Sequence, residues 1–180
     1  MAESFVNSVT RAAGIVTTST AGAIGITTNL ITGISTVSVT VGDLIQNTNY
    51  IAGTKVASVV STSSVTADRD STNSSAVTSQ NVKFLGLTSC YTSASGTKSI
   101  LIGGTFANNT NSQVELTVHV YDNSGTKVGA LASRVPIPNG SSFVISDAGK
   151  TVLESLDAIR VYCDTANALD VNLGILKGVS

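Results

Sequence analysis

Residues 114–121 alternate without interruption between apolar and mostly polar side chains, and a period of two is the pattern of a half-buried β-strand. The four residues that follow, Asp122-Asn123-Ser124-Gly125, tolerate the backbone of a hairpin turn. This segment therefore predicts an antiparallel strand pair, with the returning strand at 127–135. The apolar positions are Val114, Leu116, Val118 and Val120, and they alternate with Glu115, Thr117, His119 and Tyr121.

The same rhythm of strand and turn continues through the C-terminal half. Runs rich in Val, Ile and Thr are separated by Gly, Asn, Asp and Ser at intervals of about eight to twelve residues, which is typical of a sandwich or barrel. No window has the apolar period of a helix, and we expect only one helical turn near 41–46. The predicted fold is all-β, with a jelly-roll-like antiparallel β-sandwich at 82–180. Its strands are predicted at 82–91, 98–107, 114–121, 127–135, 141–146, 150–154, 158–163 and 169–176.

Residues 12–42 carry no charged side chain, although charged residues make up 12% of the chain. Their many Ile and Val side chains are unusual for a free linker, and a charge-free strand edge favours aggregation unless something covers it. We therefore expect residues 1–40 to be a docking segment, covered by its own domain or by a neighbouring subunit. The predicted assembly interface consists of Phe5, Val6, Ile15, Val16, Ile24, Ile26, Leu30 and Ile31.

Residues 41–81 predict a small β module ahead of the sandwich. Strands are expected at 54–60 and 64–69, and the Ser-, Thr- and Asn-rich tract at 70–80 indicates a long loop. The best candidate for a domain boundary lies near 78–83. The predicted organisation is a docking segment at 1–40, a β module at 41–81 and the sandwich at 82–180.

Composition excludes several functional classes. A net charge of −1 leaves no excess of Lys and Arg for binding nucleic acid. A hydrophobic share of 42% is too high for ordinary disorder, and no apolar run approaches the roughly 20 residues that cross a bilayer. The start, Met1-Ala2-Glu3-Ser4-Phe5, has an acid and no apolar core, so we expect no signal peptide. A net charge near zero favours association between chains.

Few acidic or basic side chains suggest chemistry. His119, the only histidine, lies on the polar face of its predicted strand and has no G-x-S-x-G nucleophile motif, so we interpret it as facing solvent or an interface. Asp68 and Asp70 could offer oxygens to a cation, but the spacing of a calcium loop is absent, which favours a charged strand end.

Three further acids, Asp147, Glu154 and Asp157, could form a glycosidase pair. Their predicted positions at turns, with few aromatic side chains for a sugar to stack on, favour a role as turn and rim acids. Cys90 and Cys163 have neither CxxC spacing nor a histidine partner, so zinc binding is not supported. We predict no cofactor, no metal and no enzymatic activity.

Several strings resemble structural proteins of bacteriophage particles. Val41-Gly42-Asp43-Leu44-Ile45, Ile51-Ala52-Gly53-Thr54-Lys55-Val56 and Val65-Thr66 resemble a Gly-Thr-x-Val β module of tail-fibre and other virion proteins of tailed phages. Pro138-Asn139-Gly140-Ser141, Val152-Leu153-Glu154 and Asp157-Ala158-Ile159-Arg160-Val161 are similar to the closing half of small virion proteins, notably of phages of marine cyanobacteria. The opening Phe5-Val6-Asn7-Ser8-Val9-Thr10-Arg11 is similar to their start. Ser155-Leu156 departs from the pattern, which has Gly in a tighter turn there.

The resemblance implies a non-enzymatic virion structural protein, localised to the virion after assembly in the host cytoplasm. Its partners would be other capsid, neck or tail proteins, and a homo-oligomer, with a trimer favoured, is expected. Decoration or completion of the head or neck surface is the leading interpretation. A tail fibre or baseplate component, or a carbohydrate-binding module that uses Tyr50, Tyr91, Tyr121 and Tyr162, remains the alternative. Folding in a reducing cytoplasm favours free thiols at Cys90 and Cys163 over a disulfide.

Overall fold

A computed structural model describes residues 3–146 and 150–179, and all of its regular elements are β-strands. The chain forms two compact units. Unit 1 combines Met1–Gly14 with Thr88–Ser180, and unit 2 consists of Ile15–Leu87. Within the described part of the chain, no helix is long and apolar enough to cross a membrane. The all-β prediction is confirmed.

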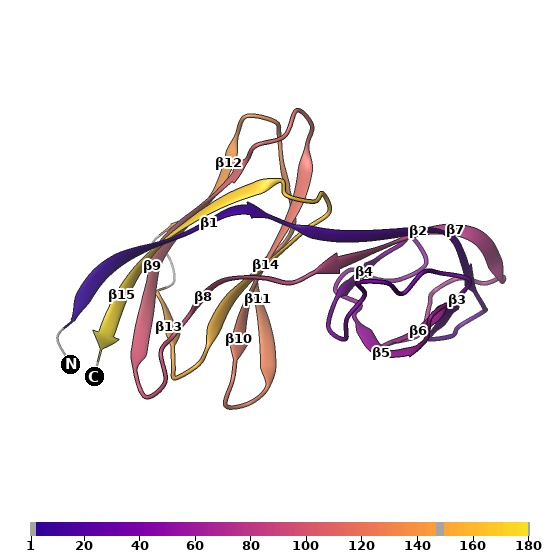
Figure 1. Ribbon diagram of the computed structural model, residues 1–180, viewed down its shortest axis with the longest axis horizontal. Coiled ribbons are helices and arrows are strands. Elements are labelled where there is room, and N and C mark those ends of the chain that lie inside the picture. Colours follow the sequence, from indigo (N-terminus) through magenta and orange to yellow (C-terminus); the bar gives the residue numbers. More distant parts are fainter. Residues whose placement is uncertain (1–2, 147–149, 180) are drawn as a thin grey trace. The chain divides into compact units, whose positions relative to one another are not determined.

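Unit 1 is a sandwich of two antiparallel sheets (Figure 1). The five-stranded sheet has the order β1-β15-β9-β12, and β13 also pairs with β9. The four-stranded sheet has the order β11-β10-β14-β8. The strands of the first sheet are β1 (Ser4–Ala13), β15 (Leu169–Val179), β9 (Lys98–Asn108), β12 (Ser142–Ile145) and β13 (Thr151–Leu153). Those of the second are β11 (Lys127–Ile137), β10 (Val114–Asp122), β14 (Ala158–Cys163) and β8 (Thr88–Thr92).

Alternating apolar side chains from both sheets fill the core of unit 1. In β15, Leu173 and Ile175 are buried, whereas Asn172, the residue before Leu173, is exposed. Leu116 and Val161 from the four-stranded sheet join the same cluster. Each strand therefore divides its side chains between the core and an outward face, as a period of two requires. The predicted strands at 98–107, 114–121, 158–163 and 169–176 all have counterparts within a few residues of these positions.

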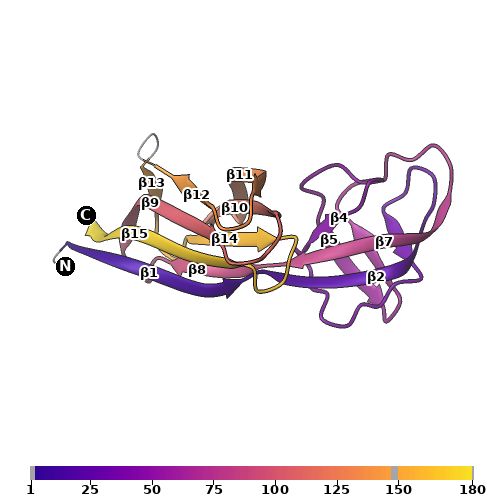
Figure 2. The same ribbon diagram turned by 90° about the horizontal axis from the view of Figure 1, so that it is seen from above.

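Unit 2 is built on one antiparallel six-stranded sheet with the order β4-β7-β2-β3-β6-β5. Figure 2 shows its two long strands, β2 and β7, side by side. Its core includes Ile24, Ile31 and Phe84. Its strands are β2 (Ile15–Ile24), β3 (Leu30–Thr32), β4 (Leu44–Gln46), β5 (Val56–Ser61), β6 (Ser64–Ala67) and β7 (Val77–Gly86).

The structure divides the chain differently from the predicted segments 1–40, 41–81 and 82–180. The segment 1–40 is not one body, because β1 pairs with β15 inside the sandwich while residues 15–40 belong to unit 2. Gly14 is the last residue of the N-terminal part of unit 1. Its φ of +120° suits glycine, and a Cβ there would collide with the carbonyl oxygen of Thr165. The boundary depends on a long-range strand pair that local patterning does not reveal.

Two local predictions are also corrected. The expected strand at 82–91 is interrupted at Leu87, with β7 before it in unit 2 and β8 after it in unit 1. The expected helical turn at 41–46 is instead a turn followed by β4, which pairs with β7. Asp43 holds this turn by accepting the backbone N–H of Thr40 at 2.8 Å. A carboxylate that binds a turn in this way mimics the start of a helix in sequence.

Candidate interaction surface

The predicted exposure of His119 is wrong. Its side chain points to the outward face of the four-stranded sheet, as the alternation requires, but the residue is only 7% exposed. The ring of Tyr162 meets it edge to face, with ring centroids 5.1 Å apart. Burial beside this aromatic ring explains the difference, because a period of two specifies a face of a sheet but not whether neighbouring side chains cover it.

The predicted acids hold loops and strand ends. Asp157 is buried and accepts the backbone N–H groups of Asn123 and Glu154, each at 2.9 Å. Glu154 itself forms an ion pair with Lys98 at 3.2 Å. Asp157 thus joins two turns, as expected for a turn acid. Asp147 lies outside the described residues.

Asp68 has a similar structural task in unit 2. Its carboxylate accepts the backbone N–H of Lys55 at 2.9 Å and faces the guanidinium of Arg69 at 3.4 Å. Burial raises the pKa of Tyr50 to about 12, and the negative charge of Asp70 adds to this rise. Among residues 3–146 and 150–179, no group of three or more His, Cys, Asp or Glu side chains could hold a metal ion.

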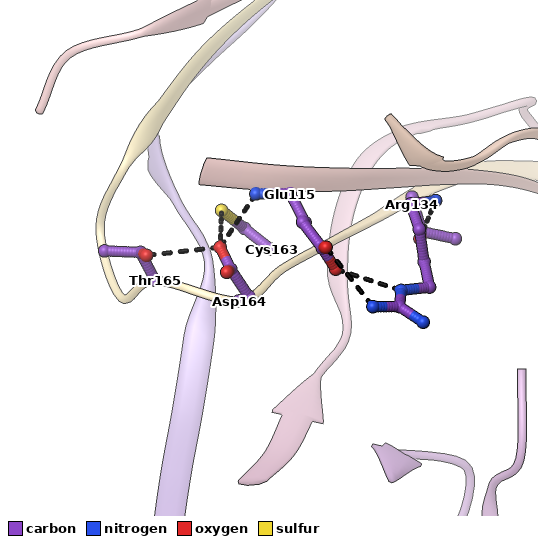
Figure 3. Close-up of polar contacts among 6 residues, drawn as sticks. Glu115, Arg134, Cys163, Asp164 and Thr165 are labelled. Atoms are coloured by element: carbon purple, nitrogen blue, oxygen red, sulfur yellow. Dashed lines mark hydrogen bonds and ion pairs between the residues drawn. The ribbon is translucent and has the colours of Figure 1, made fainter. Parts of the chain in front are cut away.

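Cys90 and Cys163 are both free and buried in the core of unit 1, so the predicted free thiols are confirmed. Burial raises the pKa of each thiol to about 11. Cys163 also lies next to Asp164, whose carboxylate accepts hydrogen bonds from the backbone of Glu115 at 2.9 Å and from Thr165 at 3.2 Å (Figure 3). These contacts join the ends of β10 and β14.

The outward face of the four-stranded sheet, which we call the polar face, holds charged and aromatic side chains that contact one another. Arg134 on β11 donates two hydrogen bonds to Glu115 on β10, at 3.0 and 3.2 Å (Figure 3). The Arg160 guanidinium on β14 lies 3.5 Å from the centre of the Tyr121 ring. Much of the polar face therefore consists of charges and rings that contact one another, although Val128 on β11 is exposed there and Arg160 Nε has no hydrogen-bond partner among the described residues.

The outward face of the five-stranded sheet is different. One side chain from each of four strands forms a continuous line across it: Phe5 pairs with Leu176, Leu176 with Ile100, and Ile100 with Val152. We call these four residues the apolar row. Phe5 is 77% exposed and Val152 52% exposed, while Leu176 and Ile100 are half-buried.

A shallow depression of about 360 Å³ adjoins the apolar row. Two outward-facing glycines, Gly103 and Gly174, lie opposite each other on β9 and β15 and leave the sheet surface low at this point. The depression is lined by Phe5, Val6, Asn7, Ile102, Gly174 and Ile175. A flat stretch of backbone beside large exposed side chains is typical of a protein contact surface and not of an enclosed ligand site.

The predicted assembly residues are divided between the two units. Phe5 belongs to the apolar row, and Val6 packs partly against the core of unit 1. Ile24 and Ile31 are fully buried in unit 2 and are therefore removed from the predicted interface, because core side chains cannot reach a partner. The other four lie in unit 2, where Ile15, Ile26 and Leu30 are exposed and Val16 is half-buried.

Sequence reasoning missed Leu176, Ile100 and Val152. A signal was present, because Leu176 continues β15 beyond its last inward residue, Ile175, and so must face outward. The row itself could not be foreseen, since it needs the register between strands from both ends of the chain. In comparisons with known proteins, the chain matches no protein-family model, no curated protein and no solved structure.

Proposed function

We propose that this chain is a non-enzymatic structural protein of a tailed-bacteriophage virion that decorates or completes the head or neck surface through β-rich contacts. The observation that carries the proposal is the apolar row. Phe5 and Val152 are large apolar side chains kept in water on a folded surface. A side chain of this kind contributes roughly 1.5–3 kcal/mol when a contact buries it fully.

The chemistry of the remaining side chains agrees with a structural role. Asp157 and Asp164 accept backbone N–H groups, and Glu115 holds Arg134. His119 is buried beside Tyr162. The groups from which an active site would be built are used to fix loops and strands in this fold.

The proposed mechanism is adhesion by shape. The outward face of the five-stranded sheet meets a particle protein, and the apolar row is buried in that contact. The low surface at Gly103 and Gly174 lets a partner's backbone or a large side chain approach the sheet closely. A tail fibre or baseplate position would use the same contact with a different particle protein.

No observation favours the carbohydrate-binding alternative. Tyr50, Tyr91 and Tyr162 are buried. Tyr121 is half-buried beneath Arg160. Sugar recognition by aromatic stacking needs an exposed ring face, and none of the four tyrosines offers one in this fold.

The decisive experiment locates the protein on particles. Purified protein carrying a small label is added to virions that lack it, and the particles are recovered on a density gradient. We expect the label to band with the particles and to saturate at a fixed copy number. A protein that remains at the top of the gradient and is never found in purified virions would refute the proposal.

A matched pair of variants tests the surface. The double substitution Phe5→Ser and Val152→Ser removes the two exposed ends of the apolar row, and we expect at least a tenfold loss of particle binding. Val128→Ser, which changes an exposed valine on β11 of the opposite sheet, is the control and should bind normally. Equal binding by both variants would contradict the assignment of the contact to this face.

A further inference from the structure

Strand β1 is an open edge of the five-stranded sheet. It pairs with β15 on one side, and among the described residues no strand pairs with its other side. Its regular part runs from Ser4 to Thr10, and a register shift follows between Thr10 and Ala13. The seven residues from Ser4 to Thr10 include no Lys, Pro or bulge, which are the usual features that protect a strand edge.

The opposite sheet shows what a protected edge looks like in the same molecule. Strand β11 is also long and also ends its sheet, yet it carries Lys127, Arg134 and Pro136, and its register with β10 shifts twice. Charge, proline and irregular register all discourage pairing with another strand. The contrast marks β1 as the long edge that is left able to accept a partner.

The side chains of β1 are arranged symmetrically about Asn7. Odd-numbered residues point to the outward face, because their even-numbered neighbours are opposite the buried Ile175, Leu173 and Val171 of β15. Counting outward from Asn7, Phe5 and Val9 lie two positions away, and Glu3 and Arg11 lie four positions away. All five residues are exposed, and the Arg11 side chain, which is 86% exposed, lies 3.9 Å from the Asp170 carboxylate on β15.

We propose that two copies of this chain associate by antiparallel pairing of their β1 strands about a two-fold axis at Asn7. Antiparallel pairing centred there sets Asn7 opposite Asn7 of the second copy and Phe5 opposite Val9 of the second copy. It also sets Glu3 opposite Arg11 of the second copy, twice by symmetry. The strand is thus complementary to itself in charge and in apolar character, as a two-fold contact requires.

This pairing uses the whole regular part of β1. Asn7 is the midpoint of Ser4–Thr10, so every residue from Ser4 to Thr10 has a partner, and only the flanking Glu3–Arg11 pair reaches the register shift that follows Thr10. Moving the axis to Phe5 or Val9 shortens the pairing or includes the shift, and separates Glu3 from Arg11 of the second copy. In the dimer, the apolar row of one copy continues through Phe5 to Val9 of the other.

This inference rests on the proposed function for the role of the outward face of the five-stranded sheet. A dimer would present two symmetric copies of that face to the particle. It differs from the trimer expected from the resemblance, because pairing of one edge with itself closes at two copies. The purified 180-residue chain tests it without any particle, so dimerisation and particle binding succeed or fail separately.

The first experiment measures mass by analytical ultracentrifugation at protein concentrations up to about 100 µM, where even a contact with a micromolar dissociation constant is populated. We expect twice the chain mass of 18.2 kDa. Asn7→Lys places like charges opposite each other at the axis and should weaken the dimer at least tenfold. Asn172→Lys is the control, because it adds the same charge to an exposed site on the same face, one strand away from the edge.

A charge exchange tests the register. Glu3→Arg alone and Arg11→Glu alone each create two like-charged pairs in a homodimer, and each should weaken it about tenfold. An equimolar mixture of the two variants restores both opposite-charge pairs, so we expect the mixed dimer to regain affinity near that of the native protein.

Each outcome decides the inference. A native dimer that Asn7→Lys weakens, that Asn172→Lys leaves intact and that the mixture restores supports it. A monomer, a trimer, or a dimer insensitive to Asn7→Lys overturns it. Dimerisation without particle binding would refute the proposed function alone, whereas particle binding by a monomeric protein would refute only this inference.

Discussion

The two outward faces of the unit 1 sandwich use their side chains differently. On the polar face, Arg134 is held by Glu115, and Arg160 lies over the ring of Tyr121. On the opposite face, Phe5 and Val152 extend into water. Both faces come from strands with the same period of two, so the difference lies in which side chains fill the outward positions.

Because of this difference, we expect side chains on one face to affect folding stability and side chains on the other to affect association. Side chains that contact one another on the polar face stabilise the folded monomer. Exposed members of the apolar row contribute little to the monomer, because they gain contacts only when something covers them. Substitutions on the two faces should therefore change different measurements.

The largest effect on stability is expected from truncating an aromatic residue on the polar face. Tyr162 is 4% exposed, so Tyr162→Ala should lower the free energy of unfolding by about 3 kcal/mol through lost burial and a cavity. Phe5→Ala is the matched change on the other face and should cost less than about 0.5 kcal/mol. Urea unfolding at low protein concentration measures both. Equal losses would remove the distinction between the faces.

The next largest effect is expected for the reactivity of the two thiols in the core between the two sheets. Because burial raises the pKa of Cys90 and Cys163 from 9.0 to about 11, the folded protein at pH 8 should hold about a hundredfold less thiolate than an exposed cysteine. Reaction with a thiol reagent should be correspondingly slow until urea unfolds the chain. Fast labelling of the native protein would show that the core is open.

The same shift sets a pH dependence. A thiol whose pKa is higher in the folded state stabilises the fold fully below about pH 9, and this contribution is lost as pH rises toward about 11. Stability measured by urea unfolding should therefore fall across that window. Replacing Cys90 and Cys163 together by Ala should flatten the fall, and an unchanged slope would assign it to other groups.

A smaller effect is expected from the cation above the Tyr121 ring. Arg160→Met keeps the aliphatic stem, removes the charge and should cost about 1 kcal/mol. A double-mutant cycle with Tyr121→Leu isolates the contact, and we expect a coupling energy of similar size. A coupling energy of zero would mean that the ring and the guanidinium do not stabilise each other.

The smallest effect should come from the ion pair of Glu115 with Arg134. Its side chains are 28% and 53% exposed, so solvent screens the attraction, and a cycle of Glu115→Gln and Arg134→Met should give about 0.5 kcal/mol. Molar salt should reduce the coupling further. A coupling above about 2 kcal/mol would show that the polar face shields this pair from solvent more than its exposure indicates.

Local pattern was enough to predict much of the sandwich. Alternation alone located β10 and β14, because a strand that packs one face on a core has an apolar side chain at every second position. It failed where a partner lies far away in the sequence. β1 belongs to the sandwich only because it pairs with β15. The sequence of residues 4–13 does not indicate which strand β1 pairs with.

The candidate interaction surface was also only partly predictable from the sequence. Phe5, which the sequence predicts as an interface residue, is exposed, whereas Ile24 and Ile31, predicted for the same apolar character, are core residues of unit 2. Hydrophobicity alone does not distinguish a covered side chain from an exposed one. The distinction depends on the sheet to which each strand is added and on which side of that sheet has a second layer.

The sequence by itself determined that this protein is all-β, since period-two patterning and abundant Val, Ile and Thr favour no other regular structure. Only the tertiary structure decided where the two units divide, that Phe5, Leu176, Ile100 and Val152 form one row, and that β1 is an edge. The physical reason is that side-chain direction is a local property of a strand, whereas register, sheet order and coverage arise from hydrogen bonds between strands distant in the chain.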